Sequence, residues 1–292
     1  MRVPPWQQIR TAVRTALEED TALGDVTTSA LFPKPVHAKA TILAEQPDGL
    51  IVAGLTVSLE VFSQVDPTLE CASLLKDGDR AASGSAILEV TGDGRSMLKA
   101  ERVALNFLQR LSGIATLTAK FCEAVRGYRV KIVDTRKTTP GLRILEKWAV
   151  TLGGGHNHRQ NLSDGILIKD NHLALAGRDI ARACRLARER APHGLKIEVE
   201  AQTLDEVRAA LDGGADIILL DNMDLPSIRK AMDVIKGRAL IEVSGGVTLA
   251  NVREIAAVGP DLISIGALTH SATAANLSMD IVPARSRRSK KR

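Results

Sequence analysis

The segment GGGHNHR, residues 153–159, brings together three residue types that bind small molecules. Consecutive glycines can form a loop whose N–H groups hold phosphate, and two histidines one residue apart can hold a transition metal. An arginine beside them binds carboxylate or phosphate through its guanidinium group. These residues alone leave three kinds of site open: a phosphate loop, a metal site and an anion pocket.

The neighbouring residues favour the anion pocket. His172 or Asp170 would have to complete a metal site with the two histidines, but the surroundings are mostly cationic and disfavour another positive ion. The sequence lacks the glycine motifs typical of nucleotide-binding loops, so we interpret the glycines as allowing close backbone approach. We expect His156 to be a surface residue, and His158 to donate a hydrogen bond to an anion beside Arg159.

More polar residues stand at the ends of six short apolar segments. The segments span residues 131–135, 166–170, 196–201, 216–222, 239–246 and 262–268. They are rich in β-branched residues and do not alternate with polar ones, which is typical of strands buried on both faces. The residues at their ends are Asp134, Thr135, Arg136, Lys137, Lys169, Asp170, Asn171, Glu200, Asp221, Asn222, Ser244, Gly245, Gly246, Gly266 and Ala267.

Helical patterns separate most of these segments. Apolar residues recur at spacings of three and four in residues 176–191, 203–214, 224–237 and 248–259. Alternation of strands and helices predicts a parallel sheet, and six units suggest a βα barrel of about six strands, an incomplete TIM-like barrel. Active sites of such barrels form at the carboxyl ends of the strands. We therefore expect the polar residues to converge on one mouth.

The charges in this mouth indicate what it binds. Arg136, Lys137, Arg159 and Lys169 predict a positive pocket for a rigid anion. Glu200 and Asp221 suit Mg²⁺ or sugar hydroxyls. The glycines and small residues of 244–246 and 265–267 precede helices and can hold a phosphate. We expect one multiply anionic small molecule and one phosphorylated molecule.

The first part of the chain has a different pattern. Residues 6–20 and 55–65 predict helices, whereas residues 37–54 and 72–90 each predict two strands around a turn. This combination indicates an α+β module with antiparallel strands. A long helical stretch, residues 96–125, then leads into the barrel, and we expect Ser112 and Gly113 to break it.

Composition limits the class of protein. The chain has 292 residues, of which 45% are hydrophobic and 25% charged, as in ordinary globular proteins. No apolar run approaches the length of a membrane span, and the first residues lack the apolar core of a signal peptide. The three cysteines are scattered, which favours a reducing cytoplasm over a disulfide framework.

The net charge of +5 is concentrated at the C-terminus. Six of the 39 basic residues lie in residues 285–292, so the remaining 33 are balanced by 34 acidic residues. We interpret this tail as a disordered, solvated end, with a nucleic-acid or membrane-surface arm as the alternative. The rest of the chain lacks the basic face with aromatic residues that a nucleic-acid groove needs, so we expect neither nucleic acid nor a membrane as partner.

Several stretches resemble one known family. Residues 134–172, DTRKTTPGLRILEKWAVTLGGGHNHRQNLSDGILIKDNH, resemble the characteristic segment of quinolinate phosphoribosyltransferase. Segments EDTALGDVTT (19–28), EVE (198–200), ILLDNM (218–223), EVSGGV (242–247) and ISIGALTHS (263–271) are similar to the family in the same order. The resemblance covers roughly residues 6–280. Trp148 stands where family members often have tyrosine, which is a conservative change.

The resemblance implies a reaction and a set of roles. Quinolinate and phosphoribosyl pyrophosphate, with Mg²⁺, would give nicotinate mononucleotide, pyrophosphate and CO₂. It implies that quinolinate is held by Arg136, His158, Arg159, Lys169 and, across a homodimer, the partner subunit's Arg102, with Thr135 nearby. Lys137 would meet the pyrophosphate, Glu200 and Asp221 the ribose and Mg²⁺. The 5′-phosphate would be held by Ser244, Gly245, Gly246, Gly266 and Ala267, with His270 nearby. Lys137, Lys169, Glu200 and Asp221 are the catalytic candidates.

The resemblance also implies two domains. We place an N-terminal α+β sandwich domain at residues 1–105, joined by a C-terminal segment at about 270–284, and the barrel at residues 106–269. Three alternatives stay open: the related family tied to molybdenum transport, a nicotinate phosphoribosyltransferase, and a non-enzymatic binding protein. Four basic residues suit a dicarboxylate better than the single carboxylate of nicotinate.

Overall fold

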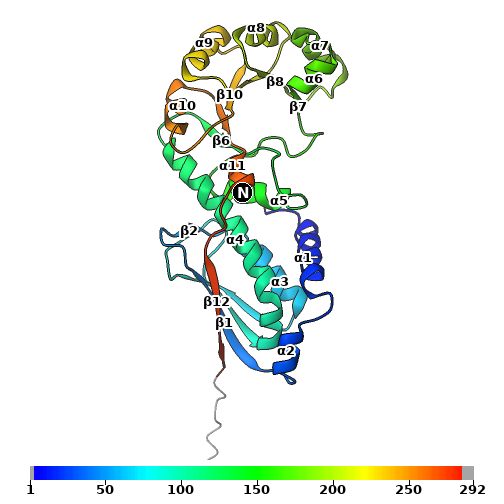
Figure 1. The fold of residues 1–292 in the computed structure, drawn as a ribbon, viewed down its shortest axis with the longest axis vertical. Helices are drawn as coiled ribbons and strands as arrows, with labels where there is room; N and C mark the ends of the chain where they lie inside the picture. Colours follow the sequence, from blue (N-terminus) through cyan, green and yellow to red (C-terminus); the bar gives the residue numbers. More distant parts are fainter. Residues whose placement is uncertain (1–2, 285–292) are drawn as a thin grey trace, which may run out of the picture. The chain divides into compact units, whose positions relative to one another are not determined.

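A computed structural model describes residues 3–284 of the chain (Figure 1). The prediction about the basic tail, residues 285–292, lies outside the described residues. The chain divides into two compact units. Unit one comprises Met1–Leu117, Thr139–Gly153 and Ala272–Arg292, and unit two comprises Thr118–Thr138 and Gly154–Ser271.

An antiparallel sheet forms the centre of unit one. Its strands are β12 (Leu277–Pro283), β1 (His37–Ala44), β5 (Ala86–Asp93) and β3 (Glu70–Ser73), in that spatial order. Every second residue of β1 is buried, as expected for a strand with one face on a core. The short strands β2 (Leu50–Ile51) and β4 (Arg80–Ala81) pair separately. Thus the two strands predicted within residues 37–54 exist, but they join different sheets.

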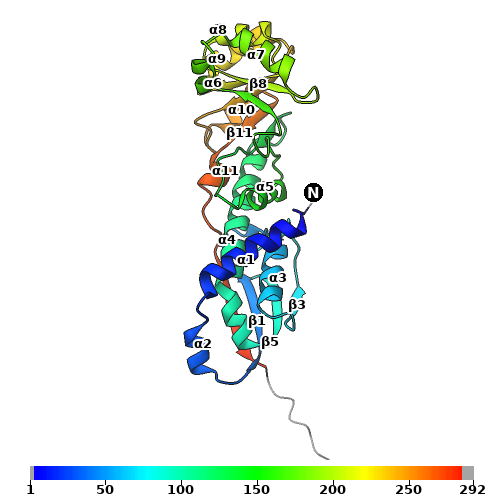
Figure 2. The same cartoon turned by 90° about the vertical axis from the view of Figure 1, so that its right-hand side faces the viewer.

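The helices of unit one are α1 (Trp6–Thr21), α2 (Val26–Leu31), α3 (Leu55–Val65), α5 (Arg143–Leu152) and most of α4 (Gly94–Ala124). Figure 2 shows α1, α3 and α4 beside the strands β1 and β5. The helix α1 buries Ile9, Val13 and Leu17, whose spacing of four places them on one face. Burial of this single face, rather than helix propensity alone, stabilises α1 in the unit.

The predicted break at Ser112 and Gly113 is wrong, because α4 is one continuous helix from Gly94 to Ala124. Ser112 donates its hydroxyl to the carbonyl of Ala53 and accepts from the N–H of the same residue. A Cβ atom at Gly113 would overlap the backbone of Thr273. These small residues therefore allow other backbone segments to approach α4 closely, and do not end it.

Unit two is built on six parallel strands, which confirms the prediction. They are β6 (Lys131–Val133), β7 (Ile166–Ile168), β8 (Ile197–Ala201), β9 (Ile217–Asp221), β10 (Leu240–Ser244) and β11 (Leu262–Ser264). Their spatial order is β6-β11-β10-β9-β8-β7, so the sheet has its ends at β6 and β7. Residue His156 forms an isolated parallel bridge with Val133, which extends pairing along the β6 edge.

Helices follow most of these strands: α6 (Asp170–Leu175) and α7 (Ile180–Arg190), α8 (Leu204–Asp212), α9 (Leu225–Ile235), α10 (Val252–Val258) and α11 (Ala267–His270). Thr203 begins α8 with a capping box, in which its hydroxyl accepts from the N–H of Glu206 and the Glu206 carboxylate accepts from the N–H of Thr203. Such caps fix where each helix starts after its strand, and so fix the loops at the carboxyl ends of the strands.

The limits of the two compact units differ from the domain boundaries that we placed from sequence, at residues 105/106 and about 270. Unit one extends to Leu117 and takes in residues 139–153. Within that segment, Trp148 and Leu152 line a cavity together with Leu55 and Thr56 of α3. No helix within residues 3–284 combines the length and apolar character that crossing a bilayer requires.

Candidate active site

The carboxyl ends of the strands of unit two carry nearly all the residues that we predicted for the site. They are Thr135, Arg136 and Lys137 after β6, Lys169 after β7, Glu200 in β8, Asp221 in β9, Ser244, Gly245 and Gly246 at the end of β10, and Gly266, Ala267 and His270 after β11. Because parallel strands end at one edge of the sheet, these residues share one rim.

Two of the predicted residues contact each other directly. The Lys169 ammonium forms a hydrogen-bonded ion pair with Oε1 of Glu200. Burial raises the pKa of Glu200, Lys169 lowers it, and the negative charges of Asp221 and Asp170 raise it. This part of the rim therefore combines three carboxylates with one ammonium group, and the ammonium holds one of the carboxylates in place.

The end of β9 is tied to the end of β10. Asp221 accepts hydrogen bonds from Gln202 Nε2 at 3.3 Å and from Asn222 Nδ2 at 3.0 Å. The N–H of Asn222 donates to the carbonyl of Ser244 at 3.0 Å. Gly245 has a φ of +85°, and a Cβ atom there would overlap the Asn222 side chain. Only glycine fits this turn, which brings backbone next to the acidic part of the rim.

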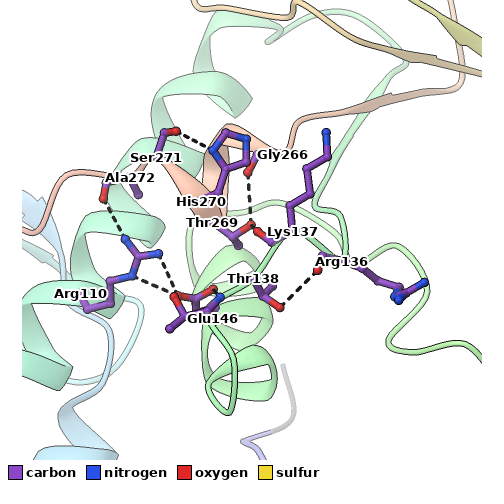
Figure 3. A network of polar contacts seen from close by, with 11 residues as sticks. Arg110, Arg136, Lys137, Thr138, Glu146, Gly266, Thr269, His270, Ser271 and Ala272 are labelled. Atoms are coloured by element: carbon purple, nitrogen blue, oxygen red, sulfur yellow. Dashed lines mark hydrogen bonds and ion pairs between the residues drawn. The ribbon is translucent and has the colours of Figure 1, made fainter.

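Lys137 lies beside the loop that follows β11 (Figure 3). Thr269 donates its hydroxyl to the carbonyl of Lys137 at 2.7 Å, and the same hydroxyl lies 3.3 Å from the carbonyl of Gly266. Nδ1 of His270 lies 2.6 Å from the hydroxyl oxygen of Ser271. The exposed ammonium of Lys137 is thus carried by a backbone that is fixed to the short helix α11.

Two arginines on the rim have unsatisfied hydrogen-bond donors. Among the described residues, Nε of Arg136 and Nε of Arg159 are buried without a hydrogen-bond partner. Burial lowers the pKa of Arg159, and so does the positive charge of Arg136, whereas Glu198 and Glu200 raise it. Buried guanidinium N–H groups without acceptors are costly, so an anion bound between them would be favourable.

The two histidines of GGGHNHR are in different surroundings. His156 is exposed, as predicted, and its backbone pairs with β6. The side chain of His158 is only 14% exposed, and its Nε2 lies 3.0 Å from Oε2 of Glu198 and 3.6 Å from Oε2 of Glu242. Its Nδ1 accepts the N–H of Arg159 at 2.7 Å. The ring that we predicted to donate to a bound anion therefore contacts the barrel interior here.

Our sequence reasoning missed the two glutamates in this interior cluster. Glu198 stands two residues before Glu200 on β8, and Glu242 two residues before Ser244 on β10. Residues two apart on a strand share a face, so this spacing was the available signal. Burial raises the pKa of Glu242 to about 7, the charge of Glu198 raises it and His158 lowers it.

Arg102 belongs to unit one, unlike the other predicted residues. It lies on α4 and is exposed. Unit one also has a cavity of about 800 Å³ lined by α1, α4 and residues 140–142 and 144. The neighbours of Arg102 on α4 that line this cavity are Val103, Asn106, Phe107 and Arg110.

A buried carboxylate orders the part of unit one that begins at Thr139 (Figure 3). Glu146 is fully buried. Its Oε1 accepts two hydrogen bonds from the Arg110 guanidinium, from Nη2 at 2.9 Å and from Nε at 3.0 Å. The same carboxylate accepts from the N–H and the hydroxyl of Thr139 at 3.0 Å and 2.7 Å. The TTPG segment, residues 138–141, is therefore fixed at its second threonine.

Comparison with family models matches nearly the whole chain. Residues 25–112 match the model described as the quinolinate phosphoribosyl transferase N-terminal domain. Residues 114–280 match the model of the C-terminal domain of the same family. Both matches are consistent with the sequence resemblance described above.

Relatives of similar length carry corresponding names. The chain is 43% identical over 263 residues to a probable nicotinate-nucleotide pyrophosphorylase [carboxylating] of Bacillus subtilis (strain 168), with 90% of each chain covered. It is 39% identical over 296 residues to quinolinate phosphoribosyltransferase [decarboxylating] 2b, mitochondrial, of Nicotiana tabacum, covering 95% of this chain and 83% of that protein. The structure of NadC from Streptococcus pyogenes superposes with a TM-score of 0.91 at 43% identity, covering 97% and 99% of the two chains.

Proposed function

Since this chain belongs to the quinolinate phosphoribosyl transferase family, we propose that it transfers the phosphoribosyl group of phosphoribosyl pyrophosphate to quinolinate. The reaction releases pyrophosphate and CO₂ and gives nicotinate mononucleotide, which serves NAD biosynthesis. The rest of the proposal concerns the residues that carry out these steps.

The observation that carries the proposal is the pair of buried arginine Nε atoms on a rim that also carries the Lys169 ammonium group. Arg136 and Arg159 lie in the loops after β6 and before β7, and Lys169 follows β7. Quinolinate is a rigid pyridine ring with two adjacent carboxylates, so it presents four oxygen acceptors in a fixed arrangement. Guanidinium groups bind such carboxylates with two parallel hydrogen bonds. Thr135 and His158 are the polar neighbours of these arginines in sequence.

Binding of quinolinate changes the ion pair on the rim. Lys169 is held by Glu200. A carboxylate of quinolinate would share this ammonium, and Glu200 would then be available to the ribose hydroxyls. The ion pair therefore couples the two substrate sites through one contact.

The phosphorylated substrate occupies the other part of the rim. We propose that its 5′-phosphate is held by N–H groups of residues 244–246, 266 and 267, with His270 nearby, because a Cβ atom at Gly246 would have nothing within 4 Å, so the backbone of this turn is open there. Lys137 stands beside α11 and would meet the pyrophosphate. Asp221 would join Glu200 in holding the ribose.

The acidic part of the rim fits Mg²⁺. The negative charges of Asp221 and Asp170 act on Glu200, and carboxylate oxygens are the ligands that Mg²⁺ prefers. Mg²⁺ usually takes one or two carboxylates together with substrate phosphates and water, so Glu200 and Asp221 suffice. When bound, the ion neutralises charge that develops on the pyrophosphate.

The chemistry requires little proton transfer by the protein. Pyrophosphate leaves a ribose carbon that becomes cation-like, and the pyridine nitrogen supplies the electron pair for the new C–N bond. The carboxyl group next to that nitrogen then departs as CO₂, its electron pair remains on the ring carbon beside the cationic nitrogen, and one proton from water adds to that carbon. Placement of the substrates and electrostatic stabilisation by the rim therefore provide most of the rate.

We further propose that the active unit is a homodimer in which the partner subunit's Arg102 completes the quinolinate site. Arg102 is an exposed cation on α4, next to the residues that line the cavity in unit one. For the location in the cell we propose the cytoplasm, because the three cysteines are free. The relative from tobacco is named mitochondrial, so fractionation of cells that make this chain tests that point.

The function is tested with purified chain, phosphoribosyl pyrophosphate, Mg²⁺ and either quinolinate or nicotinate. We expect the nucleotide and CO₂ from quinolinate only. Turnover of nicotinate without turnover of quinolinate would show a one-carboxylate enzyme and contradict the proposal. Binding of quinolinate without any turnover would indicate a binding protein and contradict it equally.

A further inference from the structure

Below the rim, three side chains meet in the interior of unit two. His158 comes from the loop before β7, Glu198 from β8 and Glu242 from β10, and one ligand atom of each lies within 4.8 Å of the others. The glutamate side chains are 5% and 1% exposed. Since β9 lies between β8 and β10, the two glutamates come from alternate strands, like side chains of one layer inside a barrel.

Two features raise the question of whether this cluster holds a metal ion. Among the described residues, both carboxylate oxygens of Glu242 and Oε1 of Glu198 are buried without a hydrogen-bond partner. The cluster also borders a cavity of about 590 Å³, whose other ionisable lining residues are Lys131, His156, Arg159, Asp164 and Lys196. Histidine nitrogen and carboxylate oxygen are both ligand types of zinc.

The hydrogen bonds of the imidazole argue against a metal. Nδ1 of His158 accepts the N–H of Arg159 at 2.7 Å, so Nδ1 presents its lone pair there. A neutral ring then carries its proton on Nε2, and this N–H points at Oε2 of Glu198, 3.0 Å away. A metal bound at Nε2 would need the proton on Nδ1, where it would face the N–H of Arg159. The cationic side chains around the cavity disfavour a metal as well.

The same hydrogen bonds fix the backbone that carries Arg159. The N–H of His158 donates to Oδ1 of the fully buried Asp134 at 2.9 Å. The N–H and carbonyl of His156 bond to β6 on either side of Val133, at 2.9 Å and 3.1 Å. The Arg159 guanidinium donates to the carbonyl of Gly165 at 3.1 Å. The His158 ring thus links the backbone of Arg159 to the strands β8 and β10, in addition to the direct charge interaction of the Arg159 guanidinium with Glu198 and Glu200.

We propose that Glu198 and Glu242 are positioning residues for Arg159, and that they act through His158. Glu198 accepts the proton of Nε2, Glu242 lies 3.6 Å from the same nitrogen, and the ring holds the N–H of Arg159 through Nδ1. The inference rests on the proposed function only in that Arg159 binds a carboxylate of quinolinate. His158 then contributes to the quinolinate site indirectly, because it holds the backbone of Arg159 in place.

The kinetic test uses Glu198→Leu and Glu198→Gln. Leucine removes the acceptor of the Nε2 proton, and loss of one buried hydrogen bond is worth about a tenfold effect. We expect the KM for quinolinate to rise about tenfold in Glu198→Leu, while the KM for phosphoribosyl pyrophosphate stays within about twofold. Glu198→Gln should restore most of the loss, because its amide oxygen accepts the same proton.

Glu60→Leu is a matched control, since Glu60 is another buried carboxylate, 5% exposed, that pairs with Arg10 in unit one. It should leave both KM values unchanged. An equal rise of both KM values in Glu198→Leu, or failure of Glu198→Gln to rescue, would show a merely structural role and overturn the proposal.

A second measurement is independent of turnover. The ¹⁵N chemical shifts of the His158 ring in the full chain without substrate, assigned by their loss in His158→Asn, should show a proton on Nε2 and a bare Nδ1. A proton on Nδ1 would overturn the proposal, and so would one equivalent of Zn²⁺ bound by the wild type and lost in Glu242→Gln. Because the ring spectrum needs no activity, it separates failure of this inference from failure of the proposed function.

Discussion

At the scale of single residues, the rim and the interior of unit two use charged groups in opposite ways. On the rim, Arg136 and Arg159 have buried N–H groups that lack acceptors, and a bound anion would supply these acceptors. In the interior, Glu242 has buried oxygens that lack donors, and burial raises its pKa. His158 lies between the two regions and contacts the interior glutamates through one nitrogen and the backbone of Arg159 through the other.

Loss of the rim ammonium should be severe. Lys169→Ala removes a group that we assign to quinolinate and leaves the half-buried Glu200 without its partner. We expect kcat/KM to fall at least about a hundredfold, because both the anion site and the carboxylate next to it are disturbed. Steady-state kinetics with quinolinate as the varied substrate measures this. Lys120→Ala, at an exposed position on α4, is the control and should retain activity; a loss of less than about fivefold in Lys169→Ala would contradict the assignment.

The pKa of Glu242 predicts how the stability of the fold depends on pH. Its folded value is raised from 4.5 to about 7, so between these values the native chain binds more protons than the unfolded chain. The free energy of unfolding should therefore fall as pH rises through that range.

Glu242→Gln removes the titrating group and should abolish this loss. The free energy of unfolding of the variant minus that of the wild type should be larger at about pH 8 than at about pH 5, by at most ~3 kcal/mol. Urea unfolding at both pH values measures the difference, with Lys120→Ala as the reference. A difference between variant and wild type that is the same at both pH values would show that Glu242 does not titrate in this range.

At the scale of elements, small residues decide how closely segments pack. The helix α4 continues through Ser112 and Gly113, which local propensity alone would not favour. The reason lies outside the helix, in the backbone of Thr273 against Gly113 and that of Ala53 against Ser112. Directly after β10, Gly245 likewise allows close approach, here of the Asn222 side chain.

Gly113→Ala separates local propensity from packing. In a helix interior this change normally stabilises by about 0.5–1 kcal/mol. Because the new methyl group would overlap Thr273, we expect destabilisation by ~1–3 kcal/mol instead. Chemical denaturation gives the sign directly, and Lys120→Ala on the same helix should stay within about 0.5 kcal/mol of wild type. A stabilised Gly113→Ala would mean that the close approach does not exist in solution.

At the scale of the whole molecule, the predicted site draws on residues of both compact units. Arg102 lies in unit one, and the other cations of the quinolinate site lie in unit two. The proposal that Arg102 acts on the partner subunit's site therefore makes activity a property of the dimer.

Complementation tests this dimer. Arg102→Ala and Lys169→Ala should each be nearly inactive alone. After the two variants are mixed and allowed to exchange subunits, half of the dimers are mixed and each mixed dimer has one intact site, so about a quarter of wild-type activity should return. Mixed dimers can be verified with two different affinity tags. Absence of recovery in verified mixed dimers would show that Arg102 does not act across the interface.

The sequence by itself determined the local elements and the chemistry of the rim. Apolar runs and helical periodicity depend on neighbours in the chain, so the six parallel strands of unit two and the helix α3 were predictable. Polar residues at strand ends were predictable as a group because parallel strands end together. The resemblance added the reaction, and the family match supports it.

Only the tertiary structure decided which partners meet. The ion pair of Lys169 with Glu200, the pairing of β1 with β5 and β12, and the interior cluster of His158 join residues from different elements. Nothing local distinguishes a histidine that faces a ligand from one that faces buried glutamates, because the side-chain type is the same in both cases. That choice depends on which strands close around it, and so it is settled only when the whole sheet of unit two has formed.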